Sequence, residues 1–138
     1  MAQSTISPQS ALVYVMVIVS ASDSDMTDSE MKRIGDLVRT LPAFKGYDEE
    51  KVIQDAQNCA AIVSDEEGLE AVLGLVEEAL PKENVETAYA LACDVAVADQ
   101  RLAKEEIRIL QLIRFRLGID RLTAAALERG AIARAKAI

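Results

Sequence analysis

The chain has 138 residues, the size of one ordinary domain with a full hydrophobic core. Apolar residues make up 51% and aromatic residues only 4%, which argues against disorder and leaves Ala, Val, Leu and Ile to build the core. The net charge of −8 argues against general nucleic-acid binding, which needs a strongly basic surface.

Helix breakers are few, with six Gly and three Pro, and this composition favours helices from the N-terminus onward. Ser7-Pro8 is typical of a helix start, and the apolar run that follows predicts a buried first helix to about Ser22. Its Val and Ile content would also suit a strand, but the chain offers no second strand to pair with it. The segment Thr27-Asp28-Ser29-Glu30 is a capping box that begins a second helix, which Leu41-Pro42 ends.

The middle of the chain predicts two further helices with apolar inner faces. Asp48 is expected to cap the third helix, and Ser64 or Asp65 to begin the fourth, which Pro81 follows. The inner face of the third helix is predicted to comprise Val52, Ile53, Ala56, Cys59, Ala60 and Val63.

Three helices are predicted in the last third, and together they complete an all-α fold. Asn84 is expected to cap the fifth helix, Gly118 to end the sixth and Asp120 to cap the seventh. The sixth helix carries the apolar residues Ile107, Leu110, Ile113 and Leu117, and in the seventh Leu122, Ala125, Ala126 and Ile132 alternate with Arg121, Arg129 and Arg134. We therefore expect one domain over residues 1–138, a compact bundle of about seven helices, with residues 1–7 and 135–138 frayed.

Two acidic segments stand out between helices, and we call them the first elbow (residues 22–30) and the second elbow (residues 98–106). A shift of 76 residues aligns Asp23 with Asp99 and Glu30 with Glu106. Identities are few, but both elbows have a small residue, Asp, an apolar residue and then Glu in the first turn of a helix. The pattern indicates a weak internal pseudo-twofold repeat.

These elbows resemble the tellurite-resistance TerB-like family, whose pattern is a small residue and Asp, an apolar residue, then Glu at a helix start. The resemblance rests on residues 22–30 and 94–106 and spans nearly the whole chain in length and helix order. The chain departs from the pattern with Ser24 and Gln100 where Gly is common, and with Arg101 inside the second elbow. The resemblance implies a helical bacterial stress-response protein, pseudo-twofold related halves, and an acidic surface that binds divalent cations. It attaches no firm enzymatic reaction.

The elbows carry the candidate metal ligands, because hard cations such as Ca²⁺ bind several oxygen ligands. Asp23, Asp25 and Glu30 could converge on one ion, and Asp99 with Glu106 on another, although the spacing is not that of an EF-hand. The alternative is that the aspartates form turns and the glutamates cap helices. A reciprocal capping box cannot explain both glutamates, because the position equivalent to Thr27 is Ala103.

One further acid, Asp94, lies within an apolar stretch and is expected to need a partner. A helix N-terminus, an arginine from the C-terminal half, or an ion shared with Asp99 could each supply that partner. Asp94 is therefore also a candidate metal ligand.

The charge is uneven: residues 1–86 carry 17 acids and 6 bases, and residues 87–138 carry 6 acids and 9 bases. This asymmetry leaves open a second function, a protein–protein interaction or scaffold module with an acidic face and no metal, which binds protein partners or forms a homo-oligomer.

With no His and no phosphate-binding Gly loop, we expect no enzyme. Cys59 and Cys93 are expected to be buried and reduced in a cytoplasmic protein without membrane insertion, peripheral association remaining open.

Overall fold

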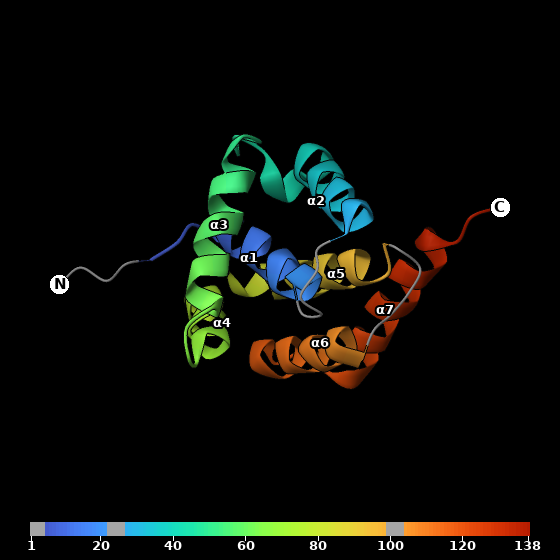
Figure 1. Ribbon diagram of the computed structural model, residues 1–138. Coiled ribbons are helices and arrows are strands. Elements are labelled where there is room, and N and C mark those ends of the chain that lie inside the picture. Colours follow the sequence, from blue (N-terminus) through green and yellow to red (C-terminus); the bar gives the residue numbers. More distant parts are fainter. Residues whose placement is uncertain (1–4, 22–26, 99–103) are drawn as a thin grey trace.

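The computed structural model describes residues 5–21, 27–98 and 104–138, and these residues form helices and connectors without a strand (Figure 1). The α-helices are α1 (Pro8–Ser20), α2 (Asp28–Thr40), α3 (Lys51–Val63), α4 (Gly68–Ala79), α5 (Val85–Ala96), α6 (Lys104–Leu117) and α7 (Arg121–Ala135). The described residues also include the short 3₁₀ helices η2 (Pro42–Phe44) and η3 (Lys82–Asn84). The predicted all-α bundle is confirmed.

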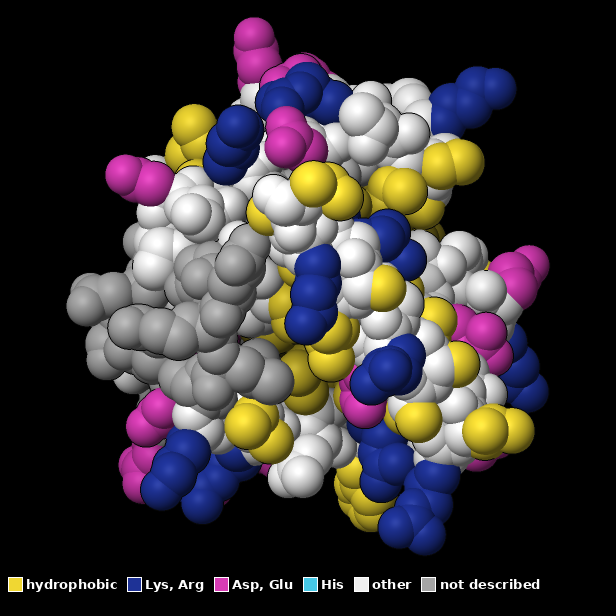
Figure 2. Space-filling model, turned by 90° about the vertical axis from the view of Figure 1, so that its right-hand side faces the viewer, with side chains coloured by type: hydrophobic (Ala, Val, Ile, Leu, Met, Phe, Trp, Pro, Cys, Tyr) yellow, Lys and Arg dark blue, Asp and Glu magenta, His cyan; other side chains and the backbone are white. Residues whose placement is uncertain are grey.

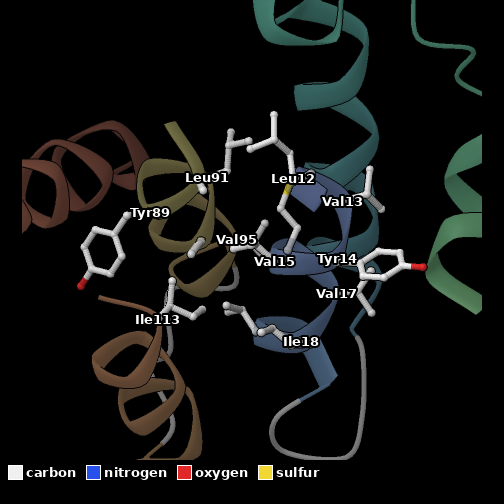
Figure 3. Close-up of a cluster of buried hydrophobic side chains, with 14 of the residues drawn as sticks. Leu12, Val13, Tyr14, Val15, Val17, Ile18, Tyr89, Leu91, Val95 and Ile113 are labelled. Atoms are coloured by element: carbon white, nitrogen blue, oxygen red, sulfur yellow. The ribbon is translucent and has the colours of Figure 1, made fainter. Parts of the chain in front are cut away.

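Helix α1 lies at the centre of the bundle, where α3, α4, α5 and α6 pack around it (Figure 1). Every residue from Ser10 to Ser20 is buried, which fits a helix that is apolar on all sides. Figure 3 shows its side chains pointing both toward α5 and toward α3. The core is one cluster of buried residues organised around this helix.

The helices follow the predicted repeat. Shifting α1 by 76 residues gives 84–96, and α5 is Val85–Ala96; the same shift carries α2 onto α6 within one residue. The repeat also relates the helix contacts. The contact of α2 with α5 corresponds to that of α6 with α1, and the contact of α3 with α1 corresponds to that of α7 with α5. The two halves therefore have equivalent packing arrangements, with α4 between them in the sequence.

Most predicted helix ends are confirmed by their capping geometry. The Ser7 hydroxyl accepts the Ser10 N–H, and the Asp120 carboxylate accepts the Thr123 N–H at 3.1 Å. Hydrogen bonding from Thr123 lowers the pKa of Asp120 below its ordinary value. Leu41 ends α2 in an extended conformation before Pro42, and Gly118 follows α6 with a φ of +70°.

Two helix starts differ from the prediction by a few residues. Asp48 accepts the Glu50 N–H at 3.0 Å in a turn, and α3 begins only at Lys51. Helix α4 begins at Gly68, beyond the predicted Ser64 or Asp65, after Glu67 adopts a left-handed φ of 61°. Tight turns thus occupy residues that the sequence pattern assigned to first helical turns.

The buried face of α3 was predicted partly wrongly. Ile53 is 63% exposed and Ala60 is exposed, whereas Asp55 is only 6% exposed. Asp55 accepts hydrogen bonds from the Ser10 hydroxyl of α1 at 2.9 Å and from the Tyr47 hydroxyl at 2.5 Å. Ser10 lies 45 residues away in the sequence and Tyr47 lies in the connector just before α3, and together they make burial of a carboxylate acceptable at this position.

Not all of the apolar residues of α6 and α7 are buried. In α6, Ile107 is 40% exposed, while Glu106 is buried at 2% exposure. In α7, Leu122 is 79% exposed, and the buried residues are Ala124 and Ala131. Helix α7 packs on α5, and small side chains allow a close approach between two helices.

No helix in the described ranges combines the length and the apolar character that crossing a bilayer requires.

Two glycines of α4 provide a matched test of the packing. A Cβ on Gly68 would lie 2.0 Å from the backbone oxygen of Ile62, whereas a Cβ on Gly74 would meet nothing within 4 Å. Gly74→Ala should therefore raise the free energy of unfolding by about 0.5–1 kcal/mol through its higher helix propensity. Gly68→Ala should lower it by about 2 kcal/mol or more because backbone must move. Urea unfolding followed by circular dichroism measures both, and equal effects would contradict the tight turn before α4.

Candidate functional site

Glu30 lies in the first turn of α2 and is almost completely buried, at 1% exposure. Its Oε1 accepts the Thr27 N–H at 3.0 Å, and the Thr27 hydroxyl accepts the Glu30 N–H at 3.1 Å. The predicted capping box is therefore present. A carboxylate has about four acceptor positions, and this backbone hydrogen bond uses one of them.

Glu106 occupies the equivalent position in the second half, as the third residue of α6, and is 2% exposed. The two glutamates thus share a helix position and a buried environment. Position 103, equivalent to Thr27, holds an alanine, so no side chain there can complete a reciprocal box. Burial of a carboxylate in the first turn of a helix is therefore common to the two halves.

A buried hydroxyl lies directly before the first elbow. Ser20 ends α1 and is 0% exposed, and its Oγ has no hydrogen-bond partner within the described residues. Hydroxyl and carboxylate oxygens are the ligand types that hard cations prefer. Ser20 was not recognised from the sequence, where a serine closing an apolar run gives no signal of burial.

Asp94 is 7% exposed, and the structure supplies one of the partners expected for it. Arg134 of α7 binds its Oδ1 through Nη2 at 2.7 Å, and Arg33 of α2 lies with Nη2 3.8 Å from its Oδ2. Two guanidinium groups therefore face one buried carboxylate. Asp94 is held by arginines from two helices that are far apart in the sequence.

The remaining predicted ligands, Asp23, Asp25 and Asp99, lie outside the described residues. Among the residues that are described, no group of three or more His, Cys, Asp or Glu side chains could hold a metal ion. Glu30 and Glu106 are the predicted elbow ligands that the structure describes, and their oxygen chemistry suits a hard cation such as Ca²⁺.

A pocket open to solvent lies between α5, α6 and α7, with a volume of about 280 Å³ and a largely apolar lining that includes Tyr89, Cys93, Leu110 and Glu128. The Tyr89 hydroxyl donates to Glu128 at 2.5 Å. Burial and this hydrogen bond raise the pKa of Tyr89 above its ordinary value. Figure 3 shows Tyr89 on the side of α5 that faces away from α1.

Both cysteines are free and buried, as predicted. Burial, with a smaller effect of nearby carboxylates, raises the pKa of each thiol to about 12.

At pH 8 the native protein should therefore react with a disulfide reagent at least about a hundredfold more slowly than the urea-unfolded chain. The released chromophore measures the rate, and rapid reaction of one thiol equivalent in the native state would contradict the burial. Because the folded pKa is raised, the thiols' contribution to stability should be lost as pH rises from about 9 toward 12.

Comparison with known proteins agrees with the helix order and the paired elbows. The model of the family described as tellurite resistance protein TerB matches residues 9–129 of the chain. Searches of curated proteins and of solved structures found no match. The matched region begins in α1 and ends in α7, so it includes both elbows and both buried glutamates. The chain belongs to the TerB family of tellurite-resistance proteins.

Proposed function

We propose that this protein is a non-enzymatic stress-response protein that binds a divalent cation, with Ca²⁺ as the first candidate, through its acidic elbows. The observation that carries the proposal is the burial of Glu30 and Glu106 at equivalent positions, at 1% and 2% exposure. Membership of the TerB family supports the link to tellurite resistance.

Burial of a carboxylate is costly unless hydrogen bonds or a cation compensate for the lost water. At Glu30 the capping box supplies one backbone hydrogen bond, and that box needs no negative charge, since glutamine serves in it equally well. A cation would account for the charge itself. The buried Ser20 hydroxyl adds an oxygen next to the same elbow.

The acids expected to complete the first site are Asp23 and Asp25, and Asp99 would join Glu106 at the second. Alternating acids in a loop can deliver several oxygens to one hard cation. Arg101 in the second elbow opposes a cation there, so the first elbow is the stronger candidate. Asp94 has Arg134 and Arg33 as partners, so its burial is compensated without an ion.

The absence of histidine from the sequence removes the commonest general base, and this supports a binding function over catalysis. The residues in the elbows are hard oxygen donors that suit reversible binding of a cation. We propose that any effect on tellurite resistance arises from this binding, with no reaction performed by the chain.

The test separates the charge of Glu30 from its capping role. Millimolar Ca²⁺ should raise the melting temperature of the metal-free protein, because binding to the native state stabilises it. Glu30→Gln should keep the free energy of unfolding without Ca²⁺ within about 1 kcal/mol, since glutamine still accepts the Thr27 N–H, but should remove the thermal shift. Differential scanning calorimetry measures both, with Mg²⁺, Mn²⁺ and Zn²⁺ as comparison ions.

Glu78→Gln is the matched control, because Glu78 is exposed on α4 and the change removes the same charge. It should leave the Ca²⁺ shift intact. Glu106→Gln examines the second elbow separately. No shift in the unmodified protein at millimolar ion, or a shift as large as that of the unmodified protein in both Glu30→Gln and Glu106→Gln, would exclude cation binding at the elbows.

A second candidate function is a protein–protein interaction module, with protein partners or another copy of the chain. It is favoured by two large apolar side chains that are strongly exposed, Phe115 at 78% and Leu122 at 79%. Single exposed apolar residues are common on protein surfaces. Phe115 and Leu122 are large, and they lie in the mildly basic C-terminal part of an acidic chain, so they are candidates for contact with a protein partner.

This alternative makes a different prediction for solution behaviour. Light scattering at low salt should show oligomers that dissociate as salt is added, whatever cation is present, because the acidic and basic parts of the chain attract each other. Phe115→Ser with Leu122→Ser should weaken the association. Monomers at every salt concentration would count against self-association as the function.

A further inference from the structure

A pocket of about 280 Å³ lies where α2, α5 and α7 meet, apart from the buried faces of Glu30 and Glu106. Its lining includes Ser29, Lys32 and Arg33 from α2, Asp94 from α5 and Arg134 from α7. These helices form the right-hand side of the molecule in Figure 1, the side that faces the viewer in Figure 2. Lys and Arg side chains occupy the middle of that face, and most Asp and Glu side chains lie toward its edges.

The buried carboxylate of Asp94 positions two guanidinium groups at the wall of the pocket. Arg134 binds one of its oxygens at 2.7 Å, and Arg33 approaches the other at 3.8 Å. Each guanidinium has five N–H donors in a planar fork, and one carboxylate uses only part of this capacity. Arg33 and Arg134 keep 35% and 55% of their side-chain surface exposed, so both remain accessible to a ligand.

The charge of the pocket is opposite in sign to that of the protein. Lys32, Arg33 and Arg134 supply three positive charges, and Asp94 compensates one of them. A second acid of the lining, Asp36, is paired with Arg39. Arg39 also binds Glu49, so the charged residues of the lining together with this pair carry a net charge of +1, in a chain whose net charge is −8. This local positive charge favours an anionic ligand.

The internal repeat shows that the fold does not need charged residues at these positions. A shift of 76 residues relates Asp94 to Ile18 and Arg33 to Ile109. Ile18 is buried in the core, and Ile109 is a partly buried residue that packs against the core cluster. The same places between paired helices are therefore apolar in one half and charged in the other. Packing of the helices at these places therefore does not require charges, which leaves the charged set free for a binding role.

We propose that this pocket binds a small free oxyanion of the phosphate class, which Lys32, Arg33 and Arg134 contact and the Ser29 hydroxyl helps to bind. The net positive charge of the lining suits an anion, and guanidinium forks suit the tetrahedral array of oxygens of a phosphate-class ion. Asp94 is a positioning residue, since it holds the arginines and its own charge would repel the ligand. The pocket borders both elbows through Ser29 and Ala98, but its proposed ligand contacts include none of the acids proposed to bind the cation.

Inorganic phosphate is the probe, titrated at low salt into the metal-free, ¹⁵N-labelled full chain. Amide signals of Ser29, Lys32, Val97 and Ala98 should shift and saturate together. Lys32→Gln should weaken binding about fivefold or more, because a charge-assisted contact is lost while the Asp94 pairs stay intact. Lys82→Gln is the control: Lys82 is exposed on η3, outside the pocket, and the change removes the same charge. It should leave the affinity unchanged.

Two further experiments test whether phosphate binding depends on a cation at the elbows and whether the pocket binds a lipid phosphate. Glu30→Gln should bind phosphate as tightly as the unmodified chain, which would show that no elbow-bound cation mediates the interaction. Vesicles of phosphatidylcholine with phosphatidic acid should not retain the protein, because its net charge opposes an anionic bilayer. Absence of saturable shifts at the pocket, equal weakening in Lys32→Gln and Lys82→Gln, or binding to the vesicles alone would overturn the proposal.

Discussion

Complete burial of α1 is the constraint on which the rest of this structure depends. Eleven consecutive residues, Ser10 to Ser20, lie out of water, and such a helix must be covered on every side. Four other helices provide that cover. Because the two halves repeat, α5 takes the matching position beside α1, and α2 and α6 begin at equivalent places around the central pair.

This arrangement determines where polar groups must be buried. The first turns of α2 and α6 bring Glu30 and Glu106 into the interior, and the end of α5 brings in Asp94. Each buried carboxylate needs compensation of its charge, and the solutions differ. Asp94 has two arginines, Glu30 has a capping box, and Asp55 has two hydroxyl donors. The proposed cation and oxyanion sites therefore have the same structural cause, because each depends on a carboxylate that the packing around α1 and α5 buries.

Much of the candidate site could be anticipated from sequence patterns. The capping box at Thr27 and the register of 76 residues both follow from residue types at fixed spacing, and the structure has them. The pocket between α2, α5 and α7 could not be anticipated. An arginine of the C-terminal half was among the expected partners of Asp94, but no pattern singled out Arg134 or pointed to Arg33, and only their common contact with Asp94 reveals a shared site. Ser20 likewise gave no signal, because burial of a hydroxyl depends on what covers it.

The sequence by itself determined the helices, most of their ends and the pairing of the two elbows. These are local properties, since a cap or a proline acts on backbone groups within one turn of itself. Only the tertiary structure decided which side of α3 and α7 is buried. Asp55 replaced Ile53 in the interior because Ser10 and Tyr47 could donate to it, and α7 buries Ala124 and Ala131, not Leu122, against α5. Apolar periodicity describes a single helix, whereas burial is decided by the partner that the helix meets.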